Sequence, residues 1–175
     1  SFGANVIRLP IHPIAWRSRG SADYLNLIDQ AVLWANELDL YLIVDWHSMG
    51  NITKELYFHP MYVTNQQETR EFWRTIASRY AGLSTIAIYE IFNEPTINSG
   101  KLGEVDWSEW RKFNEEIISI IQAHDKNIVS LVAGFNWAYD LSKVKNEPIA
   151  REQVAYAIHP YPQKVKDGPL AETWE

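Results

Sequence analysis

The chain has 175 residues, of which 46% are hydrophobic and 22% are charged, so it is long enough for one globular domain with a sizeable core. Its formal net charge of −6 argues against a nucleic-acid or anionic-membrane partner, because both require a basic face. The absence of cysteine excludes disulfides and thiolate chemistry, and no apolar run approaches membrane-spanning length. We expect a single domain over residues 1–175.

Five apolar runs along the chain predict β-strands. Each run is continuous rather than alternating, which indicates strands buried on both faces of a parallel sheet. In chain order, the strands are expected at Ala4–Leu9, Leu40–Asp45, Ile86–Phe92, Ile128–Ala133 and Val154–Ile158.

Helices are predicted between several of these strands from helical periodicity and capping signals. The first helix is expected to begin near residues 21–23. Thr64 with Gln67 predicts a capping box at the start of a second helix, and Asp106 with Glu109 resembles the same device before a third. Strand and helix therefore alternate, which predicts βα units and a parallel sheet.

The number of strands constrains the architecture. Five strands are too few for a (β/α)8 barrel, which has eight strands and typically ~250 residues. The chain forms either an open doubly wound sheet or an internal piece of a larger barrel, and the polar side chains at the strand ends favour the second. We expect the α/β class and an incomplete (β/α)8 TIM barrel that covers about strands 2–6 and lacks strands 1, 7 and 8.

The third strand is followed directly by an Asn–Glu–Pro sequence. Glu94 and Asn93 come at the carboxyl end of this strand, where barrel enzymes keep their catalytic groups. Pro95 is expected to turn the chain into a loop, because proline cannot extend the hydrogen-bond ladder of a sheet. Taken alone, the sequence is equally compatible with a polar strand end that has no chemistry.

The other strands also end at polar side chains. Arg8 interrupts an apolar run, and a buried arginine is costly unless a carboxylate or amide pairs with it. The parallel arrangement predicts that all these side chains meet on one rim. The further candidates at this rim are His47, Asn136, Trp137, His159 and Tyr161.

Other chemistries are less well supported by the sequence. His47 and His159 lie on distant strands and no His-x-His occurs, which disfavours a metal site. His12, His59 and His124 are predicted to be surface or turn residues. There is no Gly-x-Ser-x-Gly elbow for a serine nucleophile and no glycine-rich phosphate loop. No metal and no cofactor are expected.

Four segments together resemble glycoside hydrolase family 5, the cellulase family among the (β/α)8 retaining glycosidases. They occur in the order typical of that family, at Asn5–Pro10, Asp45–Ser48, Ile91–Pro95 and His159–Tyr161. The resemblance implies that Glu94 is the catalytic acid/base and that Asn93 binds the 2-hydroxyl of the sugar. It also implies that the −1 subsite is lined by Arg8, His47, His159 and Tyr161, and that Trp137 and Trp16 are sugar-stacking platforms.

One element of the family pattern is missing from the sequence. The nucleophile of the family is a second glutamate at the end of strand seven, which is expected to lie outside this chain. Glu172 and Glu175 follow no apolar strand and are not candidates for it. Because a retaining mechanism needs two carboxyl groups about 5–5.5 Å apart, we expect the 175-residue chain alone to be inactive.

The expected function is that of a secreted, monomeric endo-β-1,4-glucanase that hydrolyses cellulose or another β-glucan by double displacement. The resemblance leaves two alternatives open. The first is a β-mannanase or xyloglucanase on the same fold, and the second is a carbohydrate-binding relative without catalysis.

Overall fold

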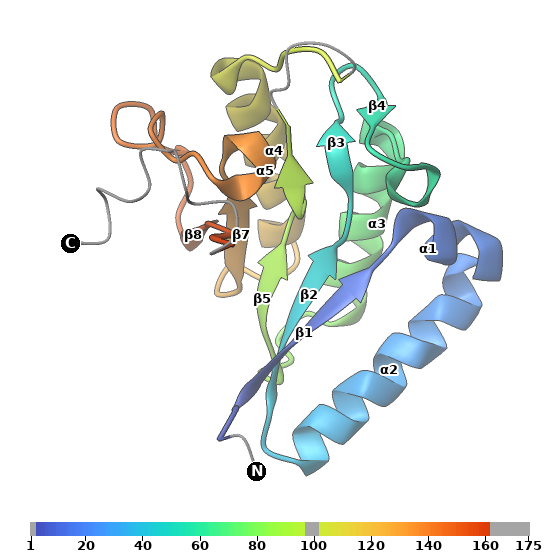
Figure 1. Cartoon of the computed structure of the whole chain (residues 1–175). Helices are drawn as coiled ribbons and strands as arrows, with labels where there is room; N and C mark the ends of the chain where they lie inside the picture. Colours follow the sequence, from blue (N-terminus) through green and yellow to red (C-terminus); the bar gives the residue numbers. More distant parts are fainter. Residues whose placement is uncertain (1–2, 97–101, 162–175) are drawn as a thin grey trace.

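The computed structural model describes residues 3–96 and 102–161 and contains a five-stranded parallel sheet. The strand order is β1-β2-β5-β7-β8, and Figure 1 shows these strands side by side. Each of the five strands expected from the sequence is present, and parallel pairing is confirmed throughout this sheet. The bounds are β1 (Val6–Ile11), β2 (Tyr41–Trp46), β5 (Ile86–Glu90), β7 (Val129–Ala133) and β8 (Val154–Ala157).

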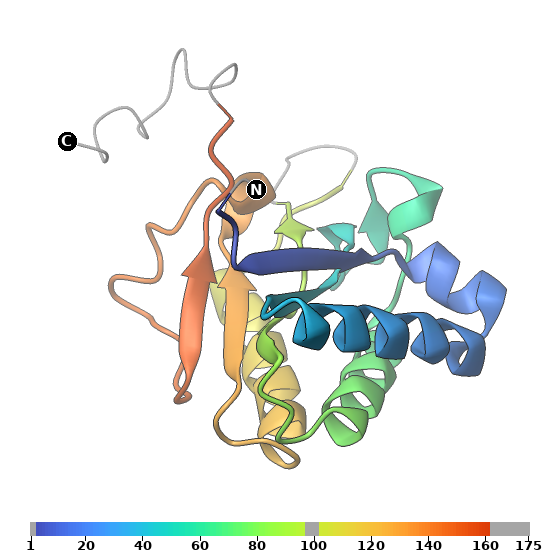
Figure 2. The same cartoon turned by 90° about the horizontal axis from the view of Figure 1, so that it is seen from below.

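Helices connect the strands and cover one face of the sheet. Within the described residues, no helix lies against the opposite face, and α3 and α4 pack against each other (Figures 1 and 2). The amphipathic pattern of the sequence explains this arrangement, because each long helix has one apolar face to bury. The helices are α1 (Pro13–Arg19), α2 (Ser21–Glu37), η1 (Pro60–Tyr62), α3 (Gln66–Arg79), α4 (Trp107–Gln122) and α5 (Phe135–Ala138).

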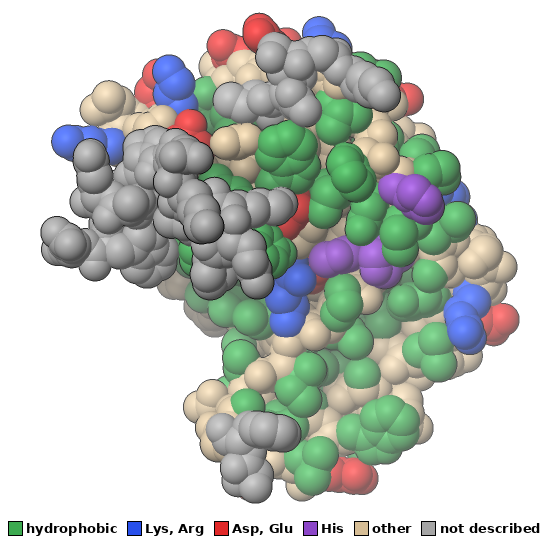
Figure 3. All heavy atoms as spheres, viewed as in Figure 1, with side chains coloured by type: hydrophobic (Ala, Val, Ile, Leu, Met, Phe, Trp, Pro, Cys, Tyr) green, Lys and Arg blue, Asp and Glu red, His purple; other side chains and the backbone are tan. Residues whose placement is uncertain are grey.

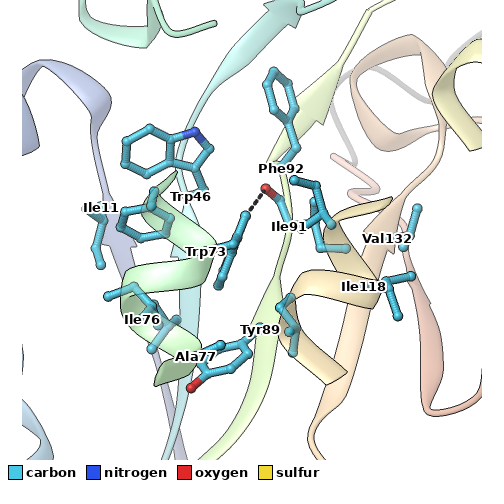
Figure 4. Packing of buried hydrophobic residues seen from close by; sticks show 14 of the residues in the cluster. Ile11, Trp46, Trp73, Ile76, Ala77, Tyr89, Ile91, Phe92, Ile118 and Val132 are labelled. Atoms are coloured by element: carbon cyan, nitrogen blue, oxygen red, sulfur yellow. Dashed lines mark hydrogen bonds between the residues drawn. The ribbon is translucent and has the colours of Figure 1, made fainter. Parts of the chain in front are cut away.

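The main hydrophobic core fills the space between the sheet and these helices. Trp73 and Trp110 are 0% and 1% exposed, and they bring large aromatic area into this layer, in which Figure 4 shows Trp73. Their indole N–H groups donate to the carbonyl oxygens of Ile91 and Ala133, each at 3.1 Å. Because both carbonyls lie at or just beyond strand ends, these bonds fix α3 and α4 against the part of the sheet that carries the polar side chains.

Alternation along the strands decides which side chains face away from the helices. On β2, Leu42 and Val44 are buried in the core, whereas Asp45 lies on the opposite face. Asp45 pairs in register with Pro10 of β1 and with Glu90 of β5. Partners in register on parallel strands project from the same face, so the two acids Asp45 and Glu90 are neighbours.

The first strand differs from the sequence expectation in position and in burial. It begins and ends two residues later than predicted, so Arg8 lies in the middle of β1 rather than near its end. Pro10 lies within the strand, which the sheet tolerates because β1 is at its edge. The prediction of burial on both faces is wrong for β1, since Val6 and Ile7 are 40% and 45% exposed.

The predicted capping box before α3 is wrong by one residue. Asn65 is the N-cap, and its side chain accepts a hydrogen bond from the N–H of Glu68 at 2.7 Å. Thr64 instead donates its hydroxyl to the Glu68 carboxylate, and Gln67 is already within the first turn. The predicted cap of α4 is confirmed, with Asp106 at the N-cap.

A small second sheet lies beyond the ends of β2 and β5. It contains β3 (Met49–Asn51), β4 (Leu56–Tyr57) and β6 (Glu94–Pro95) in the order β4-β3-β6. The expectation that Pro95 turns the chain into a loop is therefore wrong, because Pro95 pairs with Gly50 on β3. As β6 is an edge strand, proline is compatible with this pairing. The pairing gives Glu94 a fixed backbone position, with its N–H donating to the Ser48 carbonyl at 3.1 Å.

Candidate active site

A hollow of about 510 Å³ lies at the carboxyl ends of the parallel strands. Figure 3 shows histidine side chains next to a basic side chain near the middle of this face. The hollow contains every site residue expected from the sequence except Asn136 and the two tryptophans. It is lined by Arg8, His47, Met49, Tyr62, Asn93, Glu94, His159, Pro160 and Tyr161.

Arg8 lies at the centre of a network of charged side chains beneath this hollow. Its Nε and Nη2 donate to the two oxygens of Glu90 at 2.6 and 2.8 Å, and Nη2 is also 3.0 Å from Asp45. Nη2 donates in addition to Oδ1 of Asn93 at 2.7 Å. Burial disfavours the charge of Arg8, but the hydrogen bonds and negative charges of Glu90 and Asp45 outweigh burial and raise its pKa. The predicted pairing of Arg8 with carboxylates and an amide is confirmed.

The two acids that hold Arg8 were not among the predicted site residues. Asp45 and Glu90 are 0% and 1% exposed. Asp45 was expected at the end of its strand and within a family-like segment, and Glu90 inside an apolar strand, but neither was given a role at the site. Burial raises the pKa of Asp45 to about 6, although His47 and Arg8 act in the opposite direction. The sequence did contain a signal for these acids. Asp45 and Glu90 each interrupt an apolar strand, and Arg8 interrupts another, so a charged network between the strands could have been expected.

His47 is oriented by Asp45 at the end of β2. Its Nδ1 is 2.6 Å from Oδ2 of Asp45, which leaves Nε2 as the ring nitrogen available to a ligand. His12 lies edge-on against His47 with ring centroids 4.6 Å apart. The prediction of a surface or turn position missed this contact with a site residue. His12 is the N-cap residue of α1, and burial lowers its pKa.

Glu94 and His159 form the opposite side of the hollow. The Glu94 side chain is 7% exposed, and its Oε1 is 3.0 Å from Nδ1 of His159. Interactions with the carboxyl groups of Glu90, 3.6 Å away, and Glu94 raise the pKa of His159 to about 9. The backbone N–H of His159 donates to the Ala138 carbonyl at 2.9 Å, which holds the ring in place just beyond β8.

The aromatic residues expected at the site have different positions. Tyr161 lines the hollow, is 46% exposed, and has a pKa raised by burial and by the charge of Glu94. The expectation for Trp16 is wrong, because it is 8% exposed and packs edge-on against Phe72 in the core. Trp137 lies in α5 and is not among the residues that line the hollow, so its stacking role stays a prediction.

These groups suit a ligand that is rich in hydroxyl groups. The rim offers a guanidinium, two imidazoles, an amide, two phenols and one carboxyl group around a concave surface. Over residues 3–96 and 102–161, no group of three or more His, Cys, Asp or Glu side chains is arranged to hold a metal ion. The described helices include none that is long and apolar enough to span a bilayer.

Polar side chains gathered at the carboxyl ends of parallel strands are the arrangement that (β/α)8-barrel enzymes use for their active sites. The family model described as "Cellulase (glycosyl hydrolase family 5)" matches residues 1–173, and the chain belongs to this family. Among curated relatives, Endoglucanase A of Butyrivibrio fibrisolvens is 29% identical over 167 residues, covering 92% of this chain and 35% of the relative. Endoglucanase N of Pectobacterium atrosepticum is 26% identical, with coverage of 91% and 33%.

Solved structures show the same fold. The β-glucanase SdGluc5_26A of Saccharophagus degradans is 57% identical with a TM-score of 0.92, over 95% of this chain and 49% of that one. The catalytic domain of the Thermobifida fusca endoglucanase Cel5A is 23% identical with a TM-score of 0.70, over 89% and 48%. The chain therefore has the structure of part of a (β/α)8 barrel, and it spans about half of these solved relatives and about a third of the curated ones.

Proposed function

We propose that this chain provides the acid/base side of the active site of a retaining endo-β-1,4-glucanase. The observation that carries the proposal is the position of Glu94 at a strand end, in contact with His159 and within the same hollow as Arg8 and Asn93. A carboxyl group in such partly buried surroundings can donate a proton and later accept one. The family membership of the chain supports this assignment.

In the proposed reaction, protonated Glu94 donates its proton to the glycosidic oxygen as the bond to the leaving sugar breaks. A carboxylate on the other side of the sugar forms a bond to the anomeric carbon and gives a covalent glycosyl-enzyme. Ionised Glu94 then removes a proton from water, and this water displaces the carboxylate and releases the product.

The second carboxylate is proposed to come from a glutamate outside this sequence. Glu90 and Asp45 are unsuitable as nucleophiles, because both are buried and Glu90 uses both oxygens to bind Arg8. The domain of residues 1–175 is accordingly proposed to function within a longer catalytic barrel. Coverage of only about half of the solved relatives supports this view.

The remaining residues of the rim are proposed to bind the sugar in the −1 subsite. Oδ1 of Asn93 accepts a hydrogen bond from Arg8, so the amide NH₂ of Asn93 is available to the sugar 2-hydroxyl. Nε2 of His47 is free to bind another hydroxyl, since Nδ1 contacts Asp45. The same subsite includes Arg8, His159 and Tyr161.

A β-glucan is the proposed substrate. The 57% identical relative is a β-glucanase, and its structure has also been determined with cellotetraose. Since a polysaccharide does not cross membranes, the enzyme is proposed to be secreted. It is also proposed to act as a monomer. The substrate is tested with a longer protein that contains this sequence, by comparing its hydrolysis of carboxymethylcellulose, mannan and xyloglucan. Preferred cleavage of mannan would contradict the proposal of a β-glucan substrate.

The role of Glu94 is tested by Glu94→Gln in that longer protein. Glutamine cannot donate a proton to a leaving group, so we expect hydrolysis of cello-oligosaccharides to fall by about 10²–10⁴-fold. Aryl cellobiosides with an acidic phenol leave without protonation and should retain much more activity. Equal losses on both substrates would contradict the assignment, and Glu68→Gln at the surface serves as the control.

A further inference from the structure

The imidazole of His159 lies between two carboxyl groups, one facing each ring nitrogen. Its Nδ1 is 3.0 Å from Oε1 of Glu94, and its Nε2 is 3.6 Å from Oε1 of Glu90. A neutral imidazole has a single N–H and can donate to only one of two ionised carboxylates. Both contacts are favourable together only when His159 carries two protons or when one of the carboxyl groups is protonated.

Glu90 is the carboxyl group of this pair that stays ionised. Burial raises its pKa, but the interactions with His159 and Arg8 outweigh burial, so the pKa lies below its ordinary value. The two oxygens of Glu90 accept hydrogen bonds from Arg8 at 2.6 and 2.8 Å. Glu94, by contrast, must gain and lose a proton in the proposed reaction.

Charged and titratable side chains surround His159 from several elements. Acidic groups predominate among them, and the positive charge of Arg8 is already paired with two carboxylates. This balance favours a second positive charge on the ring of His159. The neighbours are Glu90 of β5, Glu94 of β6, Arg8 of β1 and Tyr161 beyond β8.

We propose that Glu90 is a positioning residue, which keeps His159 protonated on both nitrogens so that its Nδ1–H always faces Oε1 of Glu94. The inference rests on the proposed acid/base role of Glu94. With Oε1 held by His159, the other oxygen of Glu94 is the one that exchanges a proton with the substrate. Glu90 itself is 1% exposed and does not touch the sugar.

The test is an NMR titration of histidine-labelled protein, in which His159→Gln identifies the His159 signals. In the unmodified protein, we expect His159 to keep both protons well above its ordinary pKa of 6.5 and to titrate at about 9. In Glu90→Gln, the midpoint should fall by about one unit or more, which is a tenfold or larger change in the protonation equilibrium. Glu68→Gln removes a carboxylate that pairs with Arg17 instead, and it should leave the midpoint unchanged.

Two outcomes would overturn the proposal. One is titration of His159 at or below 6.5 in the unmodified protein, a measurement that does not depend on whether Glu90→Gln folds. The other is an equal midpoint for Glu90→Gln, Glu68→Gln and the unmodified protein. The titration needs no substrate, so it is distinguishable from a failure of the proposed hydrolysis, which the Glu94→Gln assay measures separately.

Discussion

Replacement of Arg8 by methionine should destabilise the protein strongly, although only one partly buried side chain changes. Arg8→Met keeps much of the apolar length but leaves Glu90 and Asp45, at 1% and 0% exposed, without their cation. Breaking a buried ion pair costs roughly 3–5 kcal/mol. The Arg8 side chain is 33% exposed, so water screens part of the interaction and the lower limit of about 3 kcal/mol is expected.

Urea unfolding followed by circular dichroism measures this loss. With a slope of about 2 kcal/mol per molar urea, a loss of about 3 kcal/mol moves the midpoint down by about 1.5 M. Arg17→Met is the matched control, because Arg17 is 42% exposed and binds Glu68 at the surface, where a pair contributes about 0–1 kcal/mol. If both variants shifted the midpoint by the same amount, the buried network would not be a major source of stability.

Three further results are expected. Asn65→Ala should cost about 1 kcal/mol in thermal unfolding because it removes the α3 cap, whereas the same change at Gln67 should cost little. Trp73→Phe should destabilise by about 1–3 kcal/mol, since it leaves the Ile91 carbonyl without its donor. The exposed Trp34 provides the control, and a loss for Trp73→Phe no greater than that for Trp34→Phe would contradict the importance of this hydrogen bond. His159 has its pKa raised from 6.5 to about 9, so its contribution to stability is complete below 6.5 and is lost as pH rises through about 9. The stability difference between the unmodified protein and His159→Gln should therefore shrink over that range, and a difference independent of pH would contradict the raised pKa.

The sequence predicted the parallel sheet and most of the rim because both depend on local patterns. Continuous apolar runs correctly indicated the five strands, and parallel strands place their carboxyl ends on one side. Arg8 was correctly expected to meet carboxylates, since a cation inside an apolar run needs a partner. The rim residue Glu94 was also identified from a local pattern, because it is an acid that follows the third expected strand.

The parts that the sequence did not predict depend on register and on contacts between distant segments. Asp45 and Glu90 can each be noticed as an acid in an apolar run, but the pairing of β1, β2 and β5 that brings both to Arg8 is not specified by any local pattern. The short β6 strand at Pro95 depends on pairing with Gly50, more than 40 residues earlier in the chain. Trp16 was misassigned because an aromatic side chain near a strand end packs against the core as readily as it faces a sugar.

The most direct test of Glu94 as the acid/base is chemical rescue of Glu94→Ala by azide, in a longer protein that contains this sequence and with an activated aryl β-cellobioside as substrate. Azide fits the space left by the carboxylate and can attack the glycosyl-enzyme from the face that water uses. We expect a faster turnover and a product that is the β-cellobiosyl azide. Formation of the α-azide would instead identify Glu94 as the nucleophile, and the absence of any rescue would contradict its role as the catalytic base.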